Sequence, residues 1–232
     1  MSLYAKHLLA EKKNTANEGD KALDLYSITK ANFSGKVQEY LLAQTFLKQI
    51  STLKAEVMKG ELDYFRTSFG SSTFLPVLEE KVEKWSKIAP GIEAPDFKYV
   101  TPEGKEVALS DLKGKLVYID LWATWCKPCL AEMPYAKKLG EKFEGQDDVV
   151  FMYVSMDKNE EAWRKYMEKN KEPHGLNLFA NGGKEIGEGY MISGIPTYIL
   201  IGKDGKIISA RAPRPSSGEV EGMIEEHLNE NS

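Results

Sequence analysis

Residues 122–134 read WATWCKPCLAEMP and contain both cysteines of the chain, Cys126 and Cys129. The segment before them, residues 116–122 (LVYIDLW), is mostly apolar, which is typical of a central strand covered on both faces. The segment after them, residues 127–143, has the pattern of a helix. The two thiols are therefore expected where a buried strand passes into a helix.

Two thiols at this spacing have three interpretations: a metal site, a structural disulfide or a redox pair. A zinc site needs about four ligands, and the three histidines (His7, His174 and His227) do not pair at ligand spacing. A disulfide that closes so short a loop removes little unfolded-state entropy, roughly 2 kcal/mol, and a domain of this size does not need it. Redox exchange is the interpretation that fits the local geometry.

The position of Cys126 at the start of a helix favours its ionised form. A thiol there lies beside unpaired backbone N–H groups and the positive end of the helix dipole, and both lower the pKa of Cys126. Lys127 adds a positive charge, and Pro128 occupies the first turn, where no backbone N–H is needed. Cys129 lies one turn further along, where we expect it to be more buried. Cys126 is the expected nucleophile, and Cys129 is expected to resolve the mixed disulfide.

The first 88 residues are expected to be helical and contain no catalytic constellation. The clearest pattern lies between Ser34, a candidate N-cap, and Gly60, a candidate helix end. Its apolar positions are Leu42, Phe46, Ile50, Leu53 and Val57, widened by Val37, Tyr40, Leu41 and Leu47. Other helical patterns cover about 2–13, 19–31 and 73–88. We interpret residues 1–88 as an amphipathic helical bundle of unknown role, with partner binding as an alternative.

Residues 89–95 (APGIEAP) break the helical pattern and are expected to form a linker. Beyond it, residues 96–232 alternate between strand and helix patterns. Strands are expected at 97–100, 105–109, 116–122, 149–154, 197–201 and 206–210, and helices at about 127–143, 158–170, 183–190 and 217–229. Residues 211–215 are expected to form a solvated loop. The predicted fold is α/β, a mixed sheet flanked by helices and preceded by an all-α region.

The residues around the cysteines resemble a known family. WATWCKPC resembles the active-site motif of the thioredoxin-like fold. Asp120, Pro134 and the segment GIPT at 194–197 stand where that family has a buried acid, a helix-kinking proline and a cis-proline loop. The spacing CxxCxxExP and the opening APDF at 94–97 resemble the TlpA/ResA type of extracytoplasmic thiol-disulfide oxidoreductases. The resemblance implies a thioredoxin-like domain.

The resemblance implies roles for two acids. Asp120 would accept the proton of Cys129 during resolution, from a site where burial raises the pKa of its carboxyl; a strand-end carboxylate that reaches water is the alternative. Glu132 would act in thiol protonation, with a solvated helix acid as the alternative. Members of this branch often have a neutral residue at the position of Asp120. How two acids divide the proton transfer is therefore left open.

The resemblance also implies a substrate surface around the cysteines. Trp125, Lys127 and Pro128 are its expected members beside the nucleophile. The Ile195–Pro196 bond is expected to be cis on the strength of the resemblance, since only about 5–6% of X–Pro bonds are cis in folded proteins. Ile195 would pair its backbone with an extended substrate.

These features imply a protein thiol-disulfide oxidoreductase that acts as an extracytoplasmic reductant. It would need no cofactor beyond the Cys126–Cys129 disulfide, and its expected partners are a disulfide-bearing protein substrate and an upstream dithiol electron donor. The net charge of −4 gives no electrostatic case for nucleic acid. The chain shows neither a bilayer-spanning run nor a signal peptide. Because Met1-Ser2-Leu3 is typical of a vector-derived start, we expect a periplasmic or extracytoplasmic protein from which a signal or membrane anchor has been removed.

A thiol peroxidase of the peroxiredoxin-like group is the nearest alternative. Peroxiredoxins carry the pattern Pro-x-x-x-Thr-x-x-Cys, whereas Thr124 stands two residues before Cys126 and no proline stands four residues before Thr124. A non-enzymatic partner-binding module and a metal carrier are the remaining alternatives.

Overall fold

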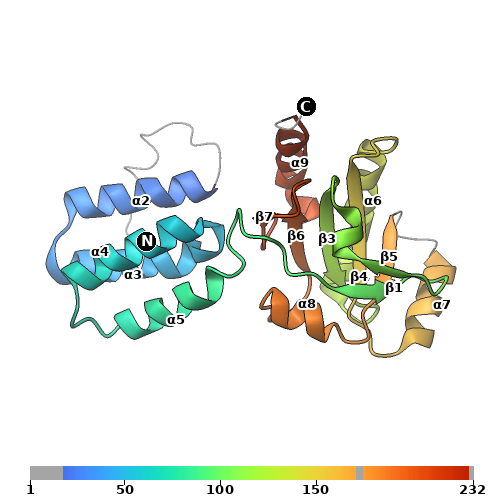
Figure 1. Ribbon diagram of the computed structural model, residues 1–232, viewed down its shortest axis with the longest axis horizontal. Coiled ribbons are helices and arrows are strands. Elements are labelled where there is room, and N and C mark those ends of the chain that lie inside the picture. The colour runs from blue at the N-terminus through green and yellow to red at the C-terminus, as the bar shows by residue number, and fades with distance from the viewer. Residues whose placement is uncertain (1–17, 171–174, 230–232) are drawn as a thin grey trace. The chain divides into compact units, whose positions relative to one another are not determined.

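The computed structural model describes residues 18–170 and 175–229 (Figure 1). The helical pattern at 2–13 lies outside the described residues, as do His7 and His174. Within the described part of the chain, no helix is both long enough and apolar enough to cross a membrane.

The chain divides into two compact units, Met1–Gly91 and Ile92–Ser232. The regular structure described in the first unit is entirely helical: α2 (Glu18–Asn32), α3 (Gly35–Gln49), η1 (Ile50–Thr52), α4 (Ala55–Ser68) and α5 (Leu75–Trp85). These helices bury an apolar core that includes Leu25, Tyr26, Leu42, Phe46, Leu53, Met58, Leu62, Phe65, Leu78 and Val82. The all-α region expected from the apolar spacing is therefore confirmed.

The expectation of a single helix between Ser34 and Gly60 is wrong, because the helix is interrupted at residues 50–54. The hydroxyl of Thr52 donates to the carbonyl of Gln49 at 2.8 Å, which offers the backbone an alternative to continuing the helix. Leu53 then adopts an extended conformation, with φ −85° and ψ 139°. Gly60 lies in the interior of α4 and ends no helix.

The apolar face of α3 is narrower than the sequence pattern suggested. Leu42 and Phe46 are buried, but Val37 and Tyr40 are 57% and 53% exposed. Ser34 has the extended backbone of an N-cap, yet its side chain makes no capping hydrogen bond. The expected helical periodicity is confirmed for Leu42 and Phe46, whereas Val37 and Tyr40 do not belong to the buried face.

The described residues of the second unit form a seven-stranded sheet in the order β2-β1-β5-β4-β3-β6-β7 (Figure 1). Its strands are β1 (Lys98–Val100), β2 (Glu106–Ala108), β3 (Leu116–Trp122), β4 (Val149–Ser155), β5 (Leu176–Phe179), β6 (Thr197–Ile201) and β7 (Ile207–Ser209). β3, β4 and β5 run parallel. β1 and β6 join this parallel group antiparallel, and each continues into an antiparallel partner, β2 or β7. The expected mixed sheet with two hairpins is confirmed.

Strand β5 was missed by the sequence pattern. It has only four residues, which is too short a segment for an alternating pattern to be recognised. Gly175 precedes it with φ +144°, a conformation that only glycine adopts readily. A Cβ at this position would lie 2.5 Å from the carbonyl oxygen of Phe151 in the neighbouring strand. The glycine allows β5 to approach β4 closely.

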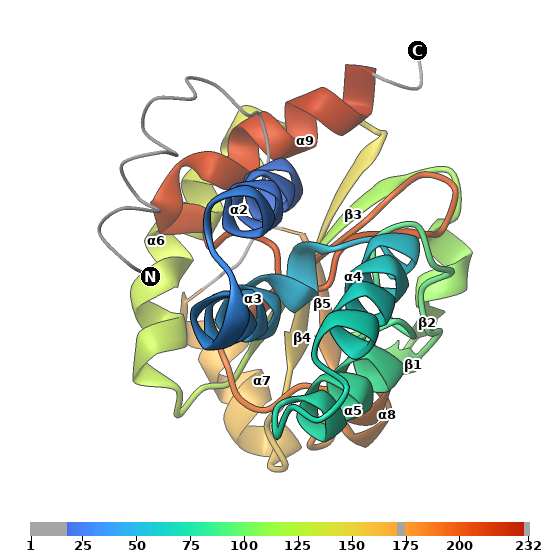
Figure 2. The same ribbon diagram turned by 90° about the vertical axis from the view of Figure 1, so that its left-hand side faces the viewer.

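Four helices flank the sheet in the described part of the second unit: α6 (Lys127–Lys142), α7 (Glu160–Asn170), α8 (Lys184–Gly189) and α9 (Glu219–Asn229). Figure 2 shows α6 and α9 on the same side of the sheet. Successive side chains of a strand point to opposite faces, so Tyr118, Asp120 and Trp122 of β3 share one face. Tyr118 and Trp122 pack in the same cluster as Met133 of α6 and Val220 of α9. Asp120 is therefore held on the face that α6 covers.

Candidate active site

The two cysteines form a disulfide at the junction between β3 and α6. Cys126 is the N-cap residue of α6, and its Sγ accepts a hydrogen bond from the backbone N–H of Cys129 at 3.2 Å. The Cα atoms of the pair are 5.2 Å apart. Cys126 is 4% exposed and Cys129 is 1% exposed, so the order is the expected one, but both sulfurs are largely covered.

This placement gives Cys126 the better environment for a thiolate. Its sulfur lies at the helix start, where free N–H groups and the helix dipole favour negative charge. Cys129 is inside the first turn and packs into the apolar cluster beneath α6. When the disulfide is reduced, the same geometry favours ionisation of Cys126 over Cys129.

Asp120 is a buried acid on the central strand. It is 2% exposed, and its Oδ1 has no hydrogen-bond partner among the described residues. Burial, and to a smaller extent the nearby charge of Glu132, raises the pKa of the Asp120 carboxyl to about 8. The alternative of a carboxylate that reaches water is wrong, because the strand runs beneath α6 at this position.

Glu132 is also buried, so the alternative of a solvated helix acid is wrong. It is 6% exposed. Ser216 donates to both of its carboxylate oxygens, from the backbone N–H at 3.0 Å and from the hydroxyl at 2.8 Å. The guanidinium of Arg214 lies 3.6 Å away, and most of that side chain is in solvent. The segment that leads into α9 thus holds the carboxylate of Glu132 in place.

That segment corrects a second expectation from the sequence. Residues 211–215 are not a solvated loop, since Ala212 and Pro215 are buried. The guanidinium of Arg211 donates to the carbonyls of Tyr190 and Met191 at 3.2 and 2.8 Å. Sequence reasoning missed Ser216 and Arg214 as partners of Glu132 because no local motif connects positions 84 residues apart.

Two tyrosines surround the acids with a weakly polar environment. The rings of Tyr118 and Tyr198 stack with centroids 5.7 Å apart. Tyr118 donates its hydroxyl to the carbonyl of Pro213 at 2.8 Å. Tyr198 lies opposite Asp120 in the sheet. Burial and then the charge of Asp120 raise the pKa of the Tyr198 hydroxyl above its ordinary value, so both phenols stay neutral.

The residues expected to form the substrate surface beside Cys126 are exposed. Trp125 is 67% exposed, whereas Trp122 is completely buried. Lys127 and Pro128 are exposed on the first turn of α6. The placement leaves these residues free to meet a partner, although their role in binding stays a prediction.

The Ile195–Pro196 peptide bond is cis, as the resemblance implied. Ile195 is half-buried and packs against the cluster that contains both cysteines. Thr197 donates its hydroxyl to the carbonyl of Gly194 at 2.7 Å, which closes the loop just before β6. The loop therefore borders the cluster that contains both cysteines and keeps part of Ile195 accessible.

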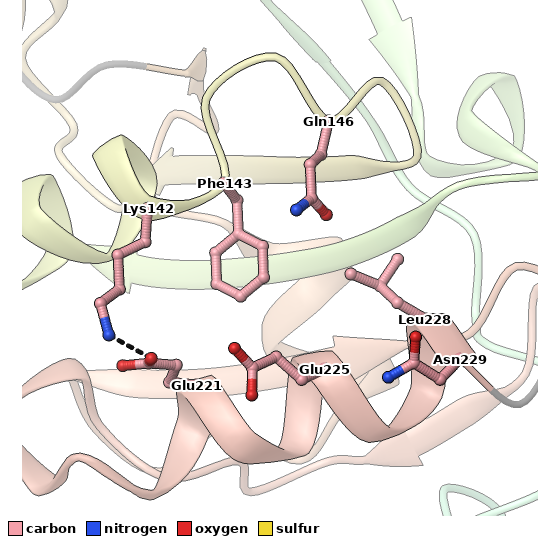
Figure 3. Close-up of a pocket in the computed structure, with 7 residues that line it drawn as sticks. All are labelled: Lys142, Phe143, Gln146, Glu221, Glu225, Leu228 and Asn229. Carbon is pink, nitrogen blue, oxygen red and sulfur yellow. Dashed lines mark hydrogen bonds and ion pairs between the residues drawn. The ribbon is translucent and has the colours of Figure 1, made fainter.

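A surface pocket lies at the far end of α6 (Figure 3). Its walls come from α6, the turn after it and α9: Lys142, Phe143, Gln146, Glu221, Glu225, Leu228 and Asn229. Lys142 and Glu221 form an ion pair across it. A helix rises about 1.5 Å per residue, which places Lys142 about 24 Å along the helix from Cys126. The pocket is separate from the cysteines.

No metal-binding cluster of three or more His, Cys, Asp or Glu residues occurs within 18–170 and 175–229. The candidate site therefore consists of the disulfide, two buried acids and the cis-proline loop.

The second unit matches a protein-family model. The Redoxin model covers residues 89–224, which is more than half of the chain. The chain belongs to the Redoxin family. This match includes the disulfide, both acids and the cis-proline loop.

Curated relatives in this family carry a named activity. Thiol-disulfide oxidoreductase ResA from Bacillus cereus is 36% identical over 141 residues, which is 60% of this chain and 79% of the relative. ResA from Bacillus subtilis is 31% identical over 144 residues, covering 61% and 75% of the two chains.

Solved structures agree with the relatives. A Bacteroides vulgatus protein assigned as a thiol-disulfide oxidoreductase is 42% identical, with a TM-score of 0.58 over 61% of this chain and 99% of that chain. A thiol:disulfide interchange protein from Bacteroides sp. is 30% identical, with a TM-score of 0.54 over 62% and 92%. With the Cys126–Cys129 disulfide, these relatives show that this Redoxin-family chain is a thioredoxin-like thiol-disulfide oxidoreductase.

Proposed function

We propose that this chain reduces disulfides in protein substrates outside the cytoplasm, with Cys126 as the nucleophile and Cys129 as the resolving thiol. The observation that carries the proposal is the disulfide at the start of α6, where Cys126 is the N-cap residue. Its sulfur already accepts a backbone N–H bond, so the same groups are ready to stabilise a thiolate. The asymmetry between cap and first turn assigns the two roles.

The proposed cycle starts from the reduced protein. The Cys126 thiolate attacks one sulfur of the substrate disulfide; that S–S bond breaks, and the released substrate sulfur takes up a proton. Cys129 loses its proton and attacks the sulfur of Cys126 in the mixed disulfide, which releases the second substrate thiolate. The substrate gains two electrons, and the protein is left with its Cys126–Cys129 disulfide. An upstream dithiol donor returns the two electrons, and no bound cofactor takes part.

Asp120 is proposed to exchange the proton of Cys129. Its pKa of about 8 lies close to the ordinary value of a thiol, about 8.5, so proton transfer between them is nearly isoenergetic. Glu132 is proposed to act through Asp120: Ser216 fixes its carboxylate, and its charge raises the pKa of Asp120. In this proposal Asp120 exchanges the proton, and Glu132 sets the pKa of Asp120.

The substrate is proposed to lie as an extended segment beside the Ile195–Pro196 loop. The half-buried Ile195 borders the cluster that contains both cysteines, and its backbone groups would pair with a substrate independently of the substrate sequence. Trp125, Lys127 and Pro128 would contact the substrate from the other side of Cys126. Broad acceptance of protein disulfides would follow.

The extracytoplasmic location and the reducing direction are proposals that rest on the resemblance to the TlpA/ResA type. A reduction potential measured against glutathione or dithiothreitol tests the direction. We expect a value nearer to about −270 mV, as in thioredoxin, than to about −120 mV, as in the strong oxidant DsbA. A value at the oxidising end would reverse the proposed electron flow.

Trapping tests the assigned roles. The Cys129→Ser variant should accumulate a mixed disulfide through Cys126 with substrate proteins, and the Cys126→Ser variant should accumulate none. Peptide mapping locates the linkage. A linkage through Cys129 in the reciprocal variant would contradict the assigned roles. Hydrogen peroxide turnover faster than disulfide reduction would favour the peroxidase alternative.

A further inference from the structure

We propose that Asp157 is a positioning residue that fixes the active-site loop and thereby sets the reactivity of Cys126. Asp157 follows the last residue of β4 by two positions and is 2% exposed. A buried carboxylate is costly unless its oxygens are hydrogen-bonded. Asp157 meets this condition with partners on the loop that carries the nucleophile.

Three donors converge on the two oxygens of Asp157. Oδ2 accepts the backbone N–H of Thr124 at 2.9 Å, and Oδ1 accepts the hydroxyl of Thr124 at 2.8 Å. Oδ2 also accepts the hydroxyl of Ser155 at 2.8 Å. The carboxylate therefore binds both the backbone and the side chain of Thr124, and the hydrogen bond from Ser155 fixes the carboxylate to the end of β4.

Thr124 stands two positions before Cys126. The loop between β3 and α6 comprises residues 123–126 only. The N-terminal end of the loop is fixed by the backbone N–H of Met156, which donates to the carbonyl of Trp122 at 2.7 Å. Its last residue, Cys126, donates its own N–H to the carbonyl of Ala123 at 3.1 Å. The Asp157 bonds hold the middle of this short loop.

The position of the loop decides where the sulfur of Cys126 lies relative to the helix. The thiolate gains from the N–H of Cys129 and from the helix dipole only if Sγ stays at the cap, and both effects fall off within the first turn. Release of Thr124 would free the loop to shift away from the cap. Asp157 thus acts on the chemistry through Thr124 without touching the reacting atoms.

Three variants separate positioning from charge. In Asp157→Asn, the amide oxygen can accept from the N–H of Thr124 and from Ser155, and the amide NH₂ can donate to the hydroxyl of Thr124, which also acts as an acceptor. This variant keeps the bonds and removes the charge. Asp157→Ala removes both, and Thr124→Val removes only the hydroxyl bond.

The structure offers a control for the loss of the same pair of hydrogen bonds at an exposed site. Asp96 also accepts the N–H and the hydroxyl of a single residue, Ser110, at 3.0 and 2.7 Å. This clamp joins the start of the second unit to η2 (Leu109–Leu112), away from the active-site loop. Asp96→Ala should lower stability without changing Cys126.

The experiment uses the full reduced chain and follows Cys126 by thiolate absorbance at 240 nm and by its alkylation rate with iodoacetamide across pH. We expect Asp157→Ala to raise the thiolate pKa by about one unit and to slow alkylation at pH 6 about tenfold. Thr124→Val should lie between Asp157→Ala and the wild type. Asp157→Asn should stay within about 0.3 pKa units of the wild type, and Asp96→Ala should match the wild type.

Three results would overturn the proposal. An unchanged thiolate pKa in Asp157→Ala, with only a lower melting temperature, would mean a purely structural role. An equal shift in Asp157→Asn would mean that the charge matters and the position does not. If Asp157→Ala fails to fold, an unchanged Thr124→Val decides against the proposal. The inference rests on Cys126 being the nucleophile, and alkylation of Cys129 in the wild type would separately contradict that assignment.

Discussion

Asp120 illustrates at the scale of one residue how burial converts a simple acid into a group that titrates near neutrality. Its ordinary pKa is 3.8, and burial followed by the charge of Glu132 raises it to about 8 in the folded chain. Between these two values the unfolded chain loses its proton while the folded chain keeps it. Stability must therefore fall as the pH rises through this window, and the fall levels off above about pH 8.

Replacement of Asp120 by Asn should remove this pH dependence. Each pKa unit corresponds to about 1.36 kcal/mol, so the wild type should lose on the order of 4 kcal/mol relative to the variant between pH 4 and pH 7. Urea unfolding of both oxidised proteins at pH 4, 6 and 8 measures the difference. Parallel stability curves for the two proteins would show that Asp120 does not titrate in this range.

Ser216 stabilises Glu132 with two hydrogen bonds, and only the one from its hydroxyl is removed by Ser216→Ala. Loss of a donor to a buried carboxylate costs about 1–2 kcal/mol. Arg214→Gln should cost less than about 1 kcal/mol, since its ion pair with Glu132 is long and the side chain is 62% exposed. Urea denaturation at pH 7 compares them. A larger loss in the Arg214 variant would mean that the ion pair, rather than Ser216, holds Glu132.

At the scale of elements, the sequence was most informative where an element is long and uniform. β3 is buried along all seven residues, so its apolar run predicted it well. The break between α3 and α4 was invisible because Ile50 and Leu53, which lie within it, are both buried. Apolar spacing reports burial, and here burial continues while the backbone hydrogen bonding changes.

The candidate site follows the same rule. Both cysteines, Asp120 and the cis Pro196 could be predicted because each belongs to a local motif or to a position fixed by resemblance. The contacts of Glu132 with Ser216 and of Thr124 with Asp157 join residues 84 and 33 positions apart. Such pairs are brought together by the packing of α6 and β4, and a single sequence holds no local signal of them.

Gly60 gives a direct test of the corrected helix boundaries. It lies in the interior of α4, and a Cβ there would meet no other atom within 4 Å. Gly60→Ala should therefore raise the free energy of unfolding by about 0.5–1 kcal/mol. Gly35, with φ +58°, is the matched control, and Gly35→Ala should lower stability by about 1 kcal/mol. Destabilisation by Gly60→Ala would restore the helix end first expected at this residue.

At the scale of the whole molecule, each of the two units buries side chains of its own. The first is built from helices packed around residues such as Phe46 and Met58, and the second from a sheet around β3. The Bacteroides vulgatus structure matches 61% of this chain but 99% of its own length. A folded protein of that family therefore exists with essentially the second unit alone.

Residues 92–232 should therefore fold and work without the helical unit. The disulfide, Asp120, Glu132 and the cis-proline loop all lie in this fragment, and the contacts that hold them come from within it. The reduction potential of the fragment should match that of the full chain within about 10 mV, since a tenfold change in the exchange equilibrium corresponds to about 30 mV. Its rate of insulin disulfide reduction should agree with that of the full chain within about threefold. The Cys126→Ser form of the fragment sets the background rate. Loss of cooperative unfolding in the fragment would show that the second unit needs the first to fold. A folded fragment with a shifted potential would instead show that the helical unit acts on the redox chemistry.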